Sequence, residues 1–190
     1  MIVNTVEDIR NEVLNEIEKY KKESEDHYDF WNEHVKYVVS EALSLADEFS
    51  ADKEIVELGA LLHDIALIRK LGERKDHHVN GEMLAREILT RYGYIGSKMA
   101  KVLACVRNHR SAKNANSIEE ICVCDADILA HFDNIPMLFN LAININNIKL
   151  NELRDWMKEC FEKDYNDLSD KTKEIFKDKY KMICEIVLGK

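Results

Sequence analysis

The chain has 190 residues, of which 36 are acidic and 27 are basic, so its formal net charge is -9. This length suits a single domain with one core, and the acidic balance argues against a protein that holds DNA or RNA polymers by bulk charge. Hydrophobic residues make up 46% of the chain, with one proline and six glycines, which disfavours both a disordered chain and a barrel or sandwich rich in tight turns. We therefore expect an all-α fold.

Helical spacing of apolar residues predicts three helices in the first third of the chain. The first runs from about residue 5 to about residue 20, and the second covers about Phe30–Phe49, with His34 on its apolar stripe. Ser50 is expected to cap the third helix. The far end of that helix carries the doublet of His63 and Asp64 between leucines and isoleucine.

A polar and basic stretch at 68–78 predicts a loop, and a helix is expected over 79–93 with Gly93 as its C-cap. Ser97 is expected to cap the next helix, at 98–110. This middle part of the chain carries three of the seven histidines, namely His77, His78 and His109.

The last part of the chain also has helical periodicity. A strongly apolar helix is predicted over 118–132 and holds Asp125 and Asp127. Three more helices are predicted, from Pro136 to about Lys149, from about Leu150 to Phe161, and from Ser169 to Leu188. These C-terminal helices either close a pocket, make a homodimer contact or pack into the core.

No signal peptide pattern starts the chain and no 18 apolar residues run together, so a cytoplasmic protein with no membrane partner is expected. The five cysteines are odd in number and unevenly spaced. Buried free thiols are therefore expected, rather than disulfides or a zinc knuckle.

Several imidazole and carboxylate groups lie in apolar surroundings, as in GALLHDIA and ICVCDADIL. Each of them has an ordinary structural explanation when taken alone, such as a hydrogen-bonded core histidine or a helix cap. Burying several such groups in one core is costly unless they compensate one another or bind metal. Imidazole together with carboxylate suits Mn, Fe, Co, Ni or Zn better than Ca or Mg alone.

The order of these groups resembles the HD-domain superfamily of metal-dependent phosphohydrolases. NEHVKYVV supplies a first histidine, LLHDIA the His-Asp doublet and DADIL a final aspartate, while HHVNGEMLAREIL and VLACVRNHR are similar to the family's two intermediate histidine segments. The resemblance implies one HD-type helical domain over 1–190. Its motif-bearing core covers about 25–135, and a C-terminal helical extension covers about 136–190.

The resemblance also implies a set of metal ligands. The family usually has a small residue one turn after the first intermediate histidine, which favours His77, with Gly81, over His78. An Ala-Asp pair in the family favours Asp127 over Asp125, and Asp125 then becomes a candidate for orienting a ligand histidine. The implied ligands are His34, His63, Asp64, His77, His109 and Asp127.

In the resembling proteins, this set holds one or two divalent transition metal ions. The first ion would take His34, His63, Asp64 and Asp127, and Asp64 would bridge to a second ion on His77 and His109. Asp64 is therefore the residue expected to be catalytic. Two ions roughly 3.5–4 Å apart can share a hydroxide and clamp a phosphoryl group during in-line attack.

The resemblance implies a small phosphate-bearing substrate, first of all a nucleotide, and the net positive charge of such a centre supports an anionic substrate. Arg110, next to His109, is expected to bind it because a guanidinium can hold phosphate with two hydrogen bonds. Two alternatives share the ligand set: a di-iron oxygenase of the same fold, and a nucleotide-sensing module without turnover. Oxygen consumption would identify the first, and binding without product the second.

Overall fold

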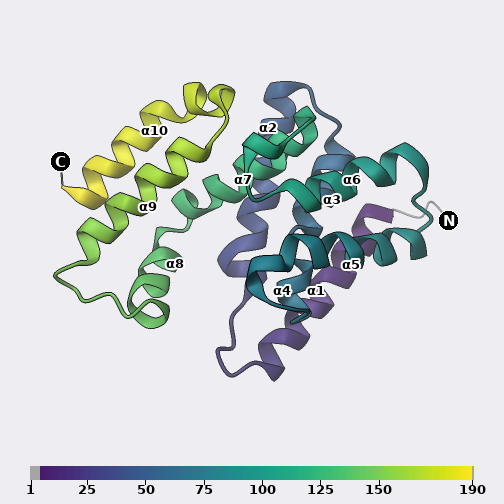
Figure 1. Cartoon of the computed structure of the whole chain (residues 1–190), viewed down its shortest axis with the longest axis horizontal. Helices are drawn as coiled ribbons and strands as arrows, with labels where there is room; N and C mark the ends of the chain where they lie inside the picture. The colour runs from purple at the N-terminus through teal and green to yellow at the C-terminus, as the bar shows by residue number, and fades with distance from the viewer. Residues whose placement is uncertain (1–4, 190) are drawn as a thin grey trace.

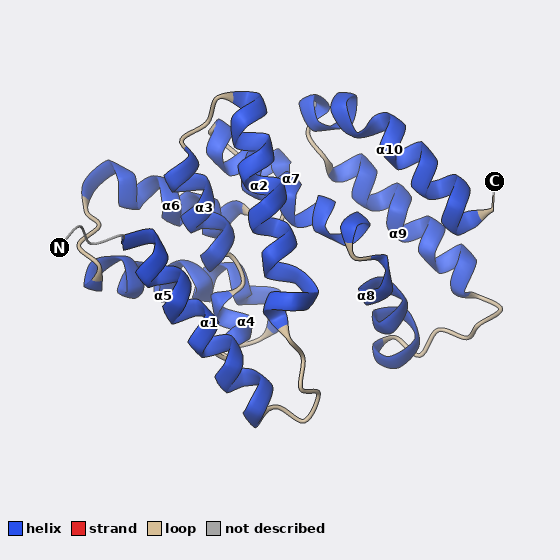
Figure 2. Cartoon of the chain, turned by 180° about the vertical axis from the view of Figure 1, so that it is seen from behind, coloured by secondary structure: helices blue, strands red, loops and turns tan. Residues whose placement is uncertain are grey.

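The computed structural model describes residues 5–189 and shows helices without strands over that range (Figure 2). The predicted all-α class is confirmed. The α-helices are α1 (Thr5–Glu23), α2 (Lys36–Phe49), α3 (Lys53–Leu62), α4 (Ile65–Ile68), α5 (His77–Arg91), α6 (Gly96–Asn108), α7 (Ile118–Asp133), α8 (Ile135–Asn140), α9 (Leu153–Asp167) and α10 (Asp170–Leu188). Two π-helical turns, Trp31–Val35 and Leu141–Ile145, and two 3-10 turns, Arg74–Asp76 and Ala112–Asn114, complete the helical segments.

Helix α7 lies at the centre of the molecule, packed against α2, α3 and α6. It is buried around most of its surface, which explains why its sequence is apolar on several faces. Figure 1 shows α9 and α10 side by side at the end of the molecule away from α1, with α8 leading to them. The residues that are predicted to be metal ligands therefore come from the bundle that α2 to α7 form. Helices α9 and α10 form a separate hairpin beside this bundle.

Two helix starts differ from the sequence prediction. Asp52, and not Ser50, caps α3, because its carboxylate accepts from the backbone N–H groups of Glu54 and Ile55. Ser50 instead ends α2 in the left-handed region, with φ of 57°. The prediction of Ser97 as a cap is also wrong, since α6 begins one residue earlier at Gly96 and no side-chain bond caps it.

Two glycines allow helices to approach closely. A methyl group at Gly59 of α3 would lie 2.7 Å from Cβ of Cys105 on α6. At Gly81 of α5, it would lie 3.3 Å from Val106 and 3.4 Å from the carbonyl oxygen of His63. The second contact holds α5 against the segment that carries the His-Asp doublet, which gives a physical reason for a small residue one turn after His77.

The first two of the three predicted C-terminal helices have other bounds in the structure. The helix expected from Pro136 ends within the π turn at Ile145, and the next begins at Leu153 and continues to Asp167. No disulfide joins cysteines of the described residues, and of the thiols expected to be buried, Cys105, Cys122 and Cys124 are buried whereas Cys160 and Cys184 are half-buried. Among the described residues, no single helix is both long and apolar enough to cross a membrane. One pair of consecutive helical segments, Ile118–Asp133 and Ile135–Ile145, is long and apolar enough when taken together, but the two segments are bent by 79° relative to each other.

Candidate metal centre

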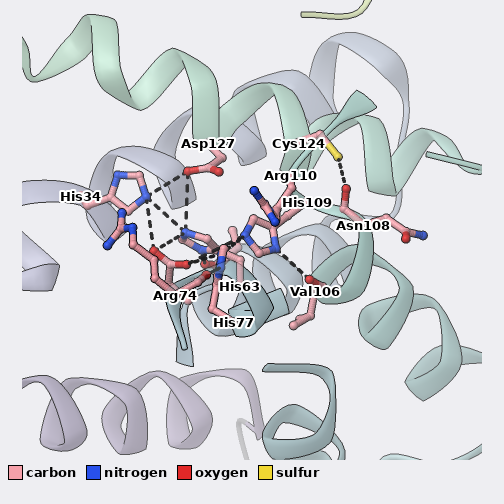
Figure 3. A network of polar contacts seen from close by, with 12 residues as sticks. His34, His63, Arg74, His77, Val106, Asn108, His109, Arg110, Cys124 and Asp127 are labelled. Atoms are coloured by element: carbon pink, nitrogen blue, oxygen red, sulfur yellow. Dashed lines mark hydrogen bonds and ion pairs between the residues drawn. The ribbon is translucent and has the colours of Figure 1, made fainter. Parts of the chain in front are cut away.

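The bundle brings six predicted side chains to one place, each from a break or an end of a helix or from the central helix (Figure 3). His34 lies on the π turn before α2, and the doublet occupies the break between α3 and α4. His77 is the first residue of α5, two residues earlier than the predicted helix start, and His109 is the C-cap of α6. Asp127 projects from the middle of α7.

The six residues form two groups, each with three potential ligand atoms within 4.8 Å of one another. The first contains His34, His63 and Asp127, and the second contains Asp64, His77 and His109. In the first group, Nε2 of His34 lies 3.0 Å from Oδ1 of Asp127. Either group is able to hold a metal ion.

Asp64 faces both groups with a different oxygen. Its Oδ1 lies 3.3 Å from Nε2 of His77 and 3.9 Å from Nε2 of His109. Its Oδ2 lies 3.5 Å from Nε2 of His63 and 3.9 Å from Nε2 of His34. The carboxylate thus lies between the two groups, in the position that a bridging ligand occupies.

Backbone hydrogen bonds set the direction of three imidazoles. Nδ1 of His63 is 2.7 Å from the Ala60 carbonyl oxygen, that of His77 is 2.6 Å from Arg74 O, and that of His109 is 2.7 Å from Val106 O. A carbonyl can only accept, so each Nδ1 carries the proton and a neutral ring points the lone pair of Nε2 inward.

The Nε2 atoms that point inward lie closer together than two neutral imidazole rings would favour. Nε2 of His34 is 3.2 Å from Nε2 of His63, and Nε2 of His77 is 2.9 Å from Nε2 of His109. Two lone pairs facing each other require a proton or a metal ion between them. The donor set therefore fits divalent transition metal ions, which bind neutral imidazole and carboxylate together.

The electrostatics of the site favour positive charge on His63 and negative charge on the two aspartates, but they disfavour positive charge on His109. Burial alone would lower the pKa of His63, but Asp64 and Asp127 outweigh it and raise this pKa to about 9. Burial would raise the pKa of both aspartates, yet the surrounding histidines hold each of them well below its usual value. For His109, burial and the nearby His63 lower the pKa to about 4.

The structure places the two less favoured candidates, His78 and Asp125, outside the two groups. His78 belongs to neither group, and its Nδ1 is buried without a hydrogen-bond partner among the described residues. Asp125 does not orient a histidine, so that expectation is wrong. Its carboxylate accepts from the Ser169 backbone N–H at 3.0 Å and from the Thr172 hydroxyl at 2.6 Å, which ties α7 to the start of α10.

Two arginines accompany the centre in Figure 3, Arg74 and Arg110. Arg110 donates from Nη1 to the carbonyl oxygen of Lys75 at 3.0 Å, which links the end of α6 to the turn before His77. Neither guanidinium forms an ion pair with a carboxylate of the described residues, whereas Arg69 pairs with Glu12 and Glu16. Arg69 is therefore a structural residue, and Arg74 and Arg110 keep their charge available.

One contact beside the centre had only a weak signal in the sequence. His131 lies one turn after Asp127, and its Nδ1 is 2.9 Å from Oδ2 of Asp164 on α9. The spacing from Asp127 marked His131 as a residue near the site. Nothing local marked Asp164, which is 33 residues away.

The comparisons with known proteins concern the family and the fold of the chain. The family model of the HD domain matches residues 32–131, a range that contains all six residues of the two groups. Among solved structures, the crystal structure of a predicted HD superfamily hydrolase from an uncultured Thermotogales bacterium has a TM-score of 0.65 and 22% sequence identity, covering 93% of this chain and 88% of that chain. No curated protein matches the chain. The solved structure supports the fold alone.

Proposed function

The chain belongs to the HD domain family, and from this premise we propose that it is a metal-dependent phosphohydrolase acting on a nucleotide or another small phosphate ester. The observation that carries the proposal is the pair of facing Nε2 contacts with the Asp64 carboxylate between them. Such an arrangement is unfavourable without cations, and it is suited to two ions that share one carboxylate.

Each residue then has a definite task. His34, His63 and Asp127 would hold one ion, His77 and His109 would hold the other, and Asp64 would contribute one oxygen to each. Ions bound in this way supply an activated water and stabilise the phosphoryl oxygens. The carbonyl bonds on Nδ1 of His63, His77 and His109 fix the ligand rings before any ion binds.

The rest of the site supports an anionic substrate. Arg74 and Arg110 would orient the phosphate, because both guanidiniums lack a carboxylate partner among the described residues and Arg110 is anchored to the turn before His77. With a net charge of -9, most of the surface repels polyanions, so the local positive charge would select small phosphate esters over nucleic-acid polymers.

The test compares wild-type protein with Asp64→Ala. We expect the wild-type protein to bind up to two divalent transition metal ions per chain and to hydrolyse one or more nucleoside phosphates. Asp64→Ala should lose both metal and activity, because it removes the carboxylate whose two oxygens face the two groups. Asp76→Ala is the matched control, since Asp76 is an exposed aspartate next to His77 that belongs to neither group.

Metal analysis after purification without chelator, combined with product chromatography, provides the readout. Retention of metal and activity in Asp64→Ala would contradict the proposal. Substrate-dependent oxygen consumption by an iron-loaded wild-type protein, without phosphate release, would replace it with the oxygenase alternative.

A further inference from the structure

The C-terminal hairpin supplies a carboxylate to the edge of the metal centre. Asp164 of α9 lies outside the residues that match the family model, and its Oδ2 is 2.9 Å from Nδ1 of His131 on α7. Asp164 is buried, although it belongs to a helix whose surface is largely polar. A buried carboxylate at hydrogen-bond distance from an imidazole fixes the orientation of that ring.

His131 lies on the open side of the centre. Its ring stacks on His34, with 6.0 Å between the centroids and 27° between the planes. Asp127, one turn before it, has a side chain that is 22% exposed, more than any other residue of the two groups, and the His131 side chain is 31% exposed. A molecule that approaches the first group from solvent therefore meets His131.

The second ring nitrogen of His131 remains available. Because Nδ1 is held by Asp164, Nε2 lies on the opposite side of the ring, and no described residue forms a hydrogen bond with it. Nor is it among the buried polar atoms without a partner, since it is accessible to solvent. With Nδ1 occupied by the carboxylate, Nε2 is the polar atom that the ring offers to a ligand, and it is able to form a hydrogen bond with a phosphate ester.

We propose that His131, oriented by Asp164 of the C-terminal hairpin, is a substrate-binding residue whose Nε2 forms a hydrogen bond with the phosphate ester at the metal centre. This inference rests on the proposed function. It assigns Asp164 the role of a positioning residue, and it makes α9 part of the active site although the family model ends at residue 131.

The alternative is that the pair only ties α9 to α7, as Asp125 ties α10 to α7 through Ser169 and Thr172. Three variants distinguish a substrate contact from a tether. His131→Asn keeps an amide near the position of Nδ1 and loses Nε2, whereas His131→Gln places an amide near the position of Nε2. Thr172→Val weakens the other tether of the hairpin and leaves His131 unchanged.

The experiment uses full-length protein loaded with Mn²⁺. It measures kcat and KM on the best nucleoside phosphate, together with the affinity for inorganic phosphate by calorimetry. His131→Asn should lower both kcat/KM and phosphate affinity by roughly tenfold to a hundredfold, the effect of losing one hydrogen bond to a charged group. His131→Gln should recover part of the phosphate affinity, Thr172→Val should match the wild type, and metal content should be unchanged in all three.

The outcomes separate this inference from the proposed function. Wild-type turnover that His131→Asn leaves unchanged, or that Thr172→Val reduces as strongly, overturns the role of His131 alone. Phosphate binding that depends on His131, in a wild-type protein without turnover of any phosphate ester, overturns the proposed function and supports the contact. A wild-type protein with neither turnover nor phosphate binding overturns both.

Discussion

At the scale of single residues, the candidate centre depends on where each imidazole directs its second nitrogen. The carbonyl bonds of His63, His77 and His109 are made to residues three positions earlier in the chain, at the ends of helices. A histidine at such an end can bond backwards with Nδ1 and leave Nε2 to point away from its own helix. Neighbouring His78 has no such bond, and its Nδ1 is left without a partner among the described residues.

The two neighbouring histidines should therefore differ in metal binding. We expect His77→Ala to lose about one metal ion per chain, because the second group keeps only Asp64 and His109. His78→Ala, the matched control, should keep the wild-type metal content. Elemental analysis of both proteins checks this, and wild-type metal content in His77→Ala would contradict the assignment of His77 as a ligand.

The sequence predicted which side chains gather at the candidate centre, but it did not predict the hydrogen bonds of the residues around that centre. Through the resemblance to the HD superfamily, the order of histidines and aspartates implied six side chains, and the fold brings these six into two groups. The task of Asp125 was not predictable in this way, because its partners Ser169 and Thr172 are more than 40 residues away in a segment that the resemblance did not cover. Asp164 was missed for the same reason.

At the scale of helices, the contact between α3 and α6 has no room for a side chain at Gly59. The 2.7 Å approach to Cβ of Cys105 means that Gly59→Ala must push the helices apart. Overpacking of this kind costs about 1–3 kcal/mol, partly offset by the better helix propensity of alanine, worth up to about 1 kcal/mol. We expect a net loss of about 1–2 kcal/mol in the free energy of unfolding, measured by urea denaturation.

Gly81→Ala is the matched glycine-to-alanine change, and its nearest contact is 3.3 Å, so its effect on stability should be smaller. A Gly59→Ala protein as stable as the wild type would mean that α3 and α6 have freedom to separate.

The presence of the longer α-helices followed from the periodicity of apolar residues, whereas several helix ends did not. Ser50 and Asp52 both lie before α3 and both are good caps, so their residue types alone could not decide between them. The structure uses Ser50 to end α2 at a positive φ, which leaves Asp52 to accept from the first N–H groups of α3. Where one short connection serves two helices, tertiary geometry chooses the cap.

At the scale of the whole molecule, a cluster of charged side chains joins the bundle to the C-terminal hairpin. Burial raises the pKa of Glu41 on α2 most strongly, Asp133 at the end of α7 raises it further, and Lys179 of α10 opposes them, giving a value of about 7. Lys179 also pairs directly with Asp133, with Nζ 2.7 Å from Oδ1.

The free energy of unfolding should therefore depend on pH through Glu41. The folded chain keeps a proton on Glu41 up to about pH 7, whereas the ordinary value is 4.5, so stability falls as the pH rises through this window. We expect Glu41→Gln to raise the free energy of unfolding by about 1 kcal/mol at pH 8, after allowance for solvent screening, and to have little effect near pH 4.5.

Denaturation curves at both pH values measure this difference. Glu48→Gln, a change at an exposed position of the same helix, is the control and should show no such pH dependence. An effect of Glu41→Gln that is equal at the two pH values would refute the assignment to a titrating carboxyl group.

The position of Asp127 on α7 has a consequence for how the protein is made. The N-terminal part of a chain leaves the ribosome first, and domains fold in that order during synthesis. The donors Asp64, His77 and His109 are all present once α6 has been synthesised, but the pair of His34 and His63 waits for α7. Because α2, α3 and α6 pack against α7, we expect neither half of the centre to be ready for metal until α7 has appeared, and Asp164 beside it follows only when α9 has been synthesised.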